Sequence, residues 1–212
     1  MLDILNKAKA LPYIIVIGSW AEFIYENSKV LDYKASLVTQ DVDLLIPNIR
    51  KPADKINVSK ALQEQGFLMN STIMSGVGLS KFHKEGLLEV EFLVQELGAG
   101  KVEPYDTHLG VTAQGLRNMN ILIDNRIEVI YNNYKITVPR PEAYILHKLV
   151  INPDRKPEYK KSKDAETVRR LVKKVDETIF NDIFAGLTKK QKHKVLQTCD
   201  KFFLKEVIDI IN

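Results

Sequence analysis

Four carboxylates stand in two pairs, each at the start of an apolar, strand-like run. Asp41 and Asp43 lead into a Leu-Leu-Ile run, and Glu89 and Glu91 lead into a Phe-Leu-Val run. Side chains two positions apart on a strand point to the same face, so each segment aims two carboxylates in one direction. Burying an ionised carboxylate without a partner is very costly, and packed like charges repel. Because Mg²⁺ and Mn²⁺ prefer oxygen ligands, these pairs predict a site for such a divalent cation.

A second chemical feature is the Gly18-Ser19 pair, which follows the apolar run Tyr13–Ile17. The pattern predicts a buried strand, a turn, and then a helix over 20–30, with Ser19 as its N-cap and Glu22 three residues later in a capping box. A strand-to-helix turn presents backbone N–H groups that can cradle phosphate. Alone, the pair also fits a plain tight turn. Followed in order by the two acidic strands, it supplies both a phosphate grip and the carboxylates of a two-metal site.

The elements that must position these residues are predicted from the hydrophobic periodicity. The segments expected are a strand at 42–46, a helix at 52–65, hairpins pairing 79–83 with 87–94 and 127–130 with 134–138, and helices from 142 onward, at 162–175 and at 189–211. Residues 114–123 fit a short helix or a strand, and 97–112 fit a loop. This order predicts an α+β fold, with a mixed β-sheet flanked by helices in residues 1–138 and a C-terminal helical domain in residues 139–212.

The composition is that of an ordinary globular protein: 212 residues, 45% hydrophobic and 27% charged, with a single cysteine. One cysteine fits a reducing compartment, the first residues lack signal-peptide features, and the apolar runs are strand-sized, so we expect a cytoplasmic protein and no membrane partner. Residues 1–138 carry 14 basic against 16 acidic side chains, and residues 139–212 carry 17 against 11. This asymmetry suits metal on one side of a site and polyphosphate on the other, although composition alone favours lysine-rich helices with solvated faces.

The ordered motifs resemble a known superfamily. Gly18-Ser19, then Thr39-Gln40-Asp41-Val42-Asp43-Leu44, then Val90-Glu91-Phe92-Leu93 is similar to the nucleotidyltransferase fold of the DNA polymerase beta superfamily. Within it, the chain resembles the bacterial branch that includes AbiEii-type abortive-infection toxins. The later segments 138–142, 147–148 and 163–164 are also similar to that branch.

The resemblance implies roles for individual residues. Asp41, Asp43 and Glu91 would be the catalytic carboxylates and the ligands of Mg²⁺ (or Mn²⁺), with Glu91 helping to deprotonate or orient the acceptor hydroxyl. Glu89 stays open as the third carboxylate. The nucleotide, ATP or another nucleoside triphosphate, would be bound by the remaining site residues, namely Gly18, Ser19, Thr39, Lys148 and Lys163. Asp164 would position a lysine.

The implied activity is metal-dependent transfer of NMP from an NTP to a hydroxyl of RNA, a protein or a small molecule, in a toxin–antitoxin or phage-defence context. The candidate acceptors include tRNA and a protein, which the sequence does not distinguish, and an antitoxin is a candidate protein partner. An inactive nucleotide-binding or regulatory relative is the main alternative. A sugar-nucleotide site built on Asp41 and Asp43 ranks last, since it leaves Gly18-Ser19 and Glu91 without a role.

One basic stretch stands apart from these motifs. Arg155, Lys156, Lys160, Lys161 and Lys163 crowd a short segment in which Tyr159 is interleaved. Such a segment can bind nucleic acid or polyphosphate, with the tyrosine stacking on a base, or it can be a basic loop without a ligand.

Overall fold

We describe a computed structural model of the chain over residues 1–35, 39–74, 77–86, 88–96, 98, 100 and 103–211. The main sheet runs in the order β1-β2-β5-β4-β3, with β7 added beside β5 and β6 beside β7. Its strands are β1 (Ile15–Val16), β2 (Asp41–Ile46), β3 (Leu68–Met74), β4 (Val77–Lys84), β5 (Leu88–Gln95), β6 (Tyr105–Asp106) and β7 (Thr112–Leu116). Strands β2 and β5 are parallel, as are β5 and β7, while the other pairs are antiparallel. The predicted mixed sheet is therefore confirmed.

The parallel pairing of β2 with β5 brings the two acidic segments together. Asp41 lies opposite Glu89, and Asp43 lies opposite Glu91. Alternation along β2 buries Val42, Leu44 and Ile46 in the large core on one face of the sheet. Asp41, Asp43 and Leu45 lie on the opposite face, and Leu45 belongs to a small second core. The carboxylates thus share a face with a packed apolar cluster and lie at its edge.

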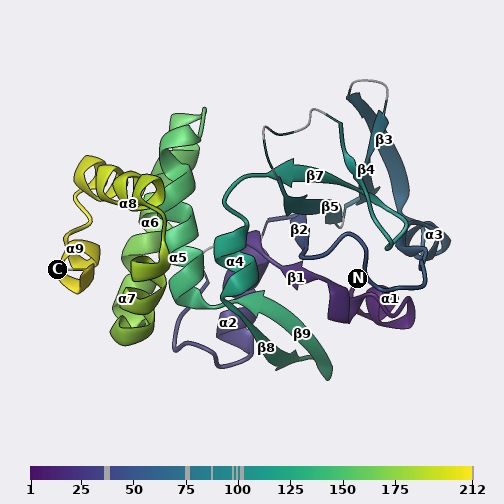
Figure 1. Ribbon diagram of the computed structural model, residues 1–212. Helices are drawn as coiled ribbons and strands as arrows, with labels where there is room; N and C mark the ends of the chain where they lie inside the picture. The colour runs from purple at the N-terminus through teal and green to yellow at the C-terminus, as the bar shows by residue number, and fades with distance from the viewer. Residues whose placement is uncertain are drawn as a thin grey trace.

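Helices surround this sheet, and a two-stranded hairpin of β8 (Arg126–Tyr131) and β9 (Tyr134–Pro139) follows it. The helices are α1 (Leu2–Lys7), α2 (Gly18–Asn27), α3 (Val58–Glu64), α4 (Asn120–Asp124), α5 (Pro141–Ile151), α6 (Glu158–Leu171), α7 (Glu177–Gly186), α8 (Lys189–Phe202) and α9 (Lys205–Ile211). Short 3₁₀ turns lie at Leu11–Tyr13, Asn152–Asp154 and Val172–Lys174. Figure 1 shows α5–α9 gathered on one side and the sheet on the other, with α2, α4 and the hairpin between them.

Helix α5 lies at the centre of the molecule, because nine of its eleven residues are buried. One buried apolar cluster extends from Leu5 through α5 to Val207, so the sheet and the C-terminal helices share a core. The boundary predicted near residue 138 falls at the end of β9, directly before α5. Among the described residues, no helix has both the length and the apolar composition that crossing a bilayer requires.

Several element boundaries differ from the sequence prediction. The helix expected from Pro52 begins at Val58, because the Asn57 side chain caps it by accepting a 2.8 Å hydrogen bond from the Lys60 N–H. The segment 114–123, which was predicted to be a short helix or a strand, contains parts of both, since β7 ends at Leu116 and α4 begins at Asn120. The hairpin of β4 and β5 is confirmed. Its second strand was predicted to begin at Leu87, which lies outside the described residues.

The C-terminal helices also differ. The helix expected at 162–175 begins earlier, at Glu158, and gives way to a 3₁₀ turn after Leu171. The single helix expected at 189–211 is two helices, because Phe203 adopts a left-handed conformation with φ of 52°. Helix α7 was not predicted, although Asp176 caps it with hydrogen bonds from the Thr178 and Ile179 N–H groups.

Candidate active site

A cavity of about 790 Å³ opens between the acidic ends of β2 and β5 and the helices α5 and α6. All eight site residues predicted from the sequence line it: Gly18, Ser19, Thr39, Asp41, Asp43, Glu91, Lys148 and Lys163. Glu89 is not among the described residues that line it. Residues distant in the sequence therefore meet in one space, with carboxylates on the sheet side and cations on the helix side.

The turn at Gly18 lies directly against Asp43. Gly18 has a φ of +66°, and a Cβ atom built on it would stand 2.6 Å from Asp43 Oδ2. The Ile17 N–H donates a 3.1 Å hydrogen bond to the Asp43 carbonyl, which fixes the turn to β2. Only glycine combines this left-handed backbone with such a close approach. A phosphate held at the turn would thus lie next to the Asp43 carboxylate.

Ser19 is not the helix N-cap, so the predicted capping box with Glu22 is wrong. The N-cap of α2 is Ile17, which has no side chain able to accept a hydrogen bond. The Ser19 hydroxyl instead pairs with the Thr39 hydroxyl at 2.9 Å, while Trp20 Nε1–H donates to the Thr39 carbonyl at 3.1 Å. These bonds hold the segment before β2 against the start of α2, so Ser19 and Thr39 form one polar wall of the cavity.

The carboxylates of the sheet perturb one another. Burial raises the pKa of the Asp43 carboxyl above its ordinary value, and the neighbouring charges of Glu91 and Asp41 raise it further. The cations Arg155 and Lys148 act in the opposite direction. A buried carboxyl whose charge is opposed by two like charges favours an additional cation in its vicinity.

Glu91 already has a cationic neighbour in this structure. Lys81, directly opposite on β4, places its ammonium against the Glu91 carboxylate and 3.8 Å from Glu89. Consistent with this pairing, no group of three or more His, Cys, Asp or Glu side chains within the described ranges is arranged to hold a metal ion. The donors nevertheless fit Mg²⁺ or Mn²⁺ in chemistry, because they are all carboxylate oxygens and they face one cavity.

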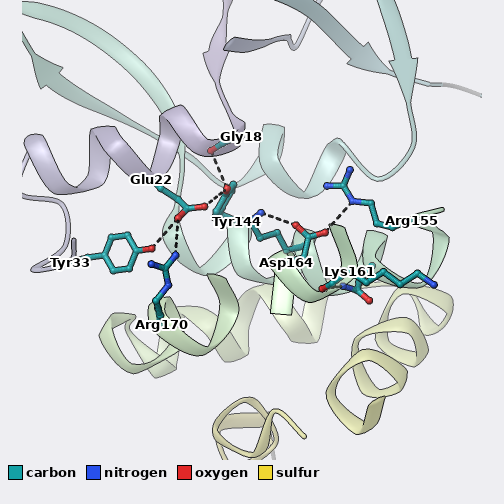
Figure 2. Close-up of polar contacts among 10 residues, drawn as sticks. Gly18, Glu22, Tyr33, Tyr144, Arg155, Lys161, Asp164 and Arg170 are labelled. Atoms are coloured by element: carbon teal, nitrogen blue, oxygen red, sulfur yellow. Dashed lines mark hydrogen bonds and ion pairs between the residues drawn. The ribbon is translucent and has the colours of Figure 1, made fainter. Parts of the chain in front are cut away.

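A buried ion-pair network forms the opposite wall. Lys148 on α5 donates to Asp164 Oδ1 at 2.9 Å. Arg155 Nε donates to Asp164 Oδ2 at 3.0 Å (Figure 2). The Asp164 side chain is 6% exposed and that of Lys148 12%. The expectation that Asp164 positions a lysine is met by Lys148. One carboxylate thus orients two cations, and a net positive charge is left facing the cavity.

A second network ties α5 to the Gly18 turn. The Tyr144 hydroxyl lies 3.0 Å from the Gly18 carbonyl oxygen and 2.8 Å from Glu22 Oε1 (Figure 2). Tyr33 donates to Glu22 Oε2 at 2.9 Å, and Arg170 lies 3.8 Å from the same oxygen. Burial and the Glu22 charge raise the pKa of Tyr144 well above its ordinary value, so it stays a neutral donor.

These supporting residues were not predicted from the sequence. Glu22 was assigned to a cap, Tyr144 was not singled out, and Arg155 was placed only within a basic stretch. His147 also lines the cavity, and burial lowers its pKa to about 3, so its imidazole is neutral near pH 7. The usable signal was the helical spacing of Tyr144, His147 and Lys148, which share the side of α5 that meets the cavity.

Comparison with known proteins adds family information. A family model described as nucleotidyltransferase matches residues 2–191. Comparison with curated proteins finds no match. The chain is similar in structure to an antigenic nucleotidyltransferase-like protein from Paracoccidioides brasiliensis, with a TM-score of 0.52, 13% identity, and coverage of 97% of this chain and 90% of that one. This likeness concerns the fold.

Weaker likenesses link the chain to ANT(2")-Ia in complex with adenylyl-2"-tobramycin. That match has a TM-score of 0.48 and 11% identity, and it covers 95% of this chain and 94% of the other. A solution structure of the antibiotic-resistance factor ANT(2'')-Ia matches with a TM-score of 0.42 and 10% identity, covering 99% of this chain and 84% of that one. The AbiEii-type resemblance stays a prediction from the sequence.

Proposed function

We propose that this chain, which belongs to the nucleotidyltransferase family, transfers NMP from a nucleoside triphosphate to a hydroxyl of an acceptor, with pyrophosphate leaving. Family membership supports nucleotidyl transfer in general. The observation that carries the residue assignments is the shared cavity, which gathers the carboxylates of β2 and β5, the Gly18 turn and the cations of α5 and α6. In-line displacement at the α-phosphate needs these three kinds of group.

Asp41, Asp43 and Glu91 would hold Mg²⁺ or Mn²⁺. When bound, such ions polarise phosphoryl oxygens and stabilise the attacking and departing oxygens. The raised pKa of Asp43 supports this assignment, because a cation would relieve the repulsion from its two neighbours. Glu91 would exchange its contact with Lys81 for the cation and accept the proton of the acceptor hydroxyl.

The triphosphate would lie between the Gly18 turn and the cationic wall. Ser19 and Thr39 offer hydroxyl groups at the turn, and Lys148 and Lys163 offer ammonium groups from the opposite side. Asp164 holds Lys148 in place, so the positive charge is oriented before the nucleotide binds. Preorganised charge of this kind stabilises a departing pyrophosphate without a reorganisation cost during the reaction.

The test is transfer from each labelled NTP, with Mg²⁺, with Mn²⁺ and with EDTA. We expect Asp41→Asn combined with Asp43→Asn to abolish transfer while the circular dichroism spectrum and the melting temperature show an intact fold. The matched control is Asp176→Asn, which removes a carboxylate from the α7 cap, outside the residues that line the cavity. Undiminished transfer by the folded double variant would refute the assignment.

The Lys81–Glu91 pair favours a second candidate, an inactive nucleotide-binding or regulatory protein. In that case an ammonium permanently occupies the place of the cation, and NTP binds without any metal dependence. Calorimetric titration of NTP with and without Mg²⁺ separates the two, because only the enzyme gains affinity with the metal. The preference for ATP, a tRNA or protein acceptor, an antitoxin partner, the toxin–antitoxin context and the cytoplasmic location stay predictions from the sequence.

A further inference from the structure

A second cavity, of about 970 Å³, is lined by the end of α2 and the segment that follows it, and by the end of α6 with the 3₁₀ turn after it. Its lining is strongly basic, with six cationic residues against two acidic ones. The cations are Lys29, Lys34, Arg169, Arg170, Lys173 and Lys174, and the acids are Glu26 and Asp32. Lys173 also lies 3.3 Å from Glu206 and Lys174 lies 3.8 Å from Asp32, in exposed ion pairs that hold weakly and that a phosphate can replace. Glu26 also accepts a 3.0 Å hydrogen bond from the Ala35 N–H, which uses part of its capacity. An excess of cations around a hollow attracts a polyanion.

The second cavity shares a wall with the catalytic cavity. Glu22 lines the catalytic cavity, whereas Tyr33 and Arg170 line the basic one. These three side chains contact one another, at 2.9 Å from Tyr33 to Glu22 and 3.8 Å from Arg170 to Glu22 (Figure 2). Arg170 Nε is buried and has no hydrogen-bond partner among the described residues, so this guanidinium keeps an unused donor. A single layer of side chains therefore separates the two cavities.

Helix α6 connects the two cavities along one face. Tyr159, Lys163 and Arg170 are four and seven positions apart, which places them on the same side of the helix. Tyr159 and Lys163 line the catalytic cavity, and Arg170 lines the basic one. From Lys163 to Arg170 the helix rises about 10 Å, the length of about three stacked nucleotides. Between them this side carries Glu166, which is exposed and ion-paired with Arg169, and the buried Thr167. Lys173 and Lys174 follow Arg170 at the far end of the helix.

We propose that the basic cavity docks the sugar-phosphate backbone of a single-stranded nucleic acid, whose terminal hydroxyl enters the catalytic cavity as acceptor. This inference rests on the proposed nucleotidyl transfer. Tyr159, 69% exposed beside Lys160 and Lys163, distinguishes a nucleic acid from an acidic protein, because an exposed ring between cations stacks on a base. The backbone would follow α6, with its phosphates on Arg170, Lys173 and Lys174.

Binding is measured by fluorescence anisotropy without NTP or metal, using labelled single-stranded RNA, single-stranded DNA and poly-glutamate. We compare Lys173→Ala/Lys174→Ala with the matched control Lys189→Ala/Lys190→Ala, an adjacent exposed pair at the start of α8. The first variant should lower the slope of log affinity against log salt by about 1.4, since each contact to a single strand contributes about 0.7. The control should retain the slope of the unmodified protein.

Two further measurements test the path along α6. Tyr159→Ala should weaken oligonucleotide binding about fivefold or more, and Tyr159→Phe should restore it, because the ring supplies the stacking. A dinucleotide should bind much more weakly than an eight-nucleotide strand, since it cannot touch both cavities. The RNA and DNA arms show which sugar the site prefers.

The outcomes separate this inference from the proposed function. Equal salt slopes for the two double variants, or tighter binding of poly-glutamate than of RNA and DNA, overturn the docking proposal even if NMP transfer to a small hydroxyl acceptor persists. A reduced slope in the Lys173/Lys174 variant, together with no transfer in any metal, supports the docking surface and overturns the nucleotidyltransferase assignment. A reduced slope with slower transfer to an oligonucleotide, but unchanged transfer to a small acceptor, supports both.

Discussion

Replacing Gly18 by alanine separates folding from catalysis at this site. At a φ of +66° an alanine costs about 1–2 kcal/mol of folding free energy. Its Cβ would lie 2.6 Å from Asp43 Oδ2, whereas ordinary contact begins at 3.4 Å, so the oxygen must retreat by about 0.8 Å. Because misplacing a reacting group by about 1 Å can cost a factor of about 100, we expect kcat for NMP transfer to fall tenfold to a hundredfold.

The matched control is Gly86→Ala in the turn between β4 and β5. Gly86 has a φ of +70°, and a Cβ atom there would meet nothing within 4 Å, so the backbone strain is the same but no carboxylate moves. Urea unfolding should show similar losses of about 1–2 kcal/mol for both variants, while pyrophosphate release slows only for Gly18→Ala. Equal activities for the two variants would refute the close packing of the turn against Asp43.

Three further predictions concern titration and the cation. Asp43→Asn should raise the melting temperature near pH 7 without metal, and it should abolish the rise of the melting temperature with Mg²⁺. The pKa of Asp43 is raised in the folded protein, so its ionisation destabilises the fold as pH increases above 3.8. An unchanged melting temperature would contradict this. His147→Leu should reduce the loss of folding stability in acid. The pKa of His147 is about 3 in the folded protein and 6.5 in the unfolded chain, so the free energy of unfolding of the unmodified protein falls by up to about 1.4 kcal/mol per pH unit as pH drops through this window. Acid titrations that overlay for both proteins would disprove it. Lys81→Met should lower the Mg²⁺ concentration needed for half-maximal transfer, because the ammonium no longer competes for Glu91; a higher requirement would mean that Lys81 instead positions this carboxylate.

The strands of the sheet were predictable because their patterns are strong. Val42, Leu44 and Ile46 alternate with the aspartates, and the run of β5 repeats this pattern, so periodicity predicted that each pair of carboxylates shares one face of its strand. The parallel register that sets Asp43 opposite Glu91 required the fold. The end of α8 could not be predicted in this way, because Phe203 adopts a left-handed backbone without any glycine or proline to mark it. A continuous helical pattern hides such a break.

The supporting residues of the site depend on tertiary contacts that no local pattern contains. Ser19 looked like a helix cap, but Thr39, twenty residues later, occupies its hydroxyl. Arg155 looked like one of many surface cations, but it pairs with the buried Asp164 after the chain turns into α6. Charge type and spacing therefore identified the groups that face the cavity, whereas their partners required the fold.

The central position of α5 has a consequence for how substrates gain entry. This helix supplies Lys148 to one wall, holds the turn on the other side through Tyr144, and is buried in the core that joins both halves. These contacts and the shared core join the halves across the opening, so a hinge motion that separated them would expose buried apolar surface. A substrate that entered this cavity would therefore meet walls already positioned by the core.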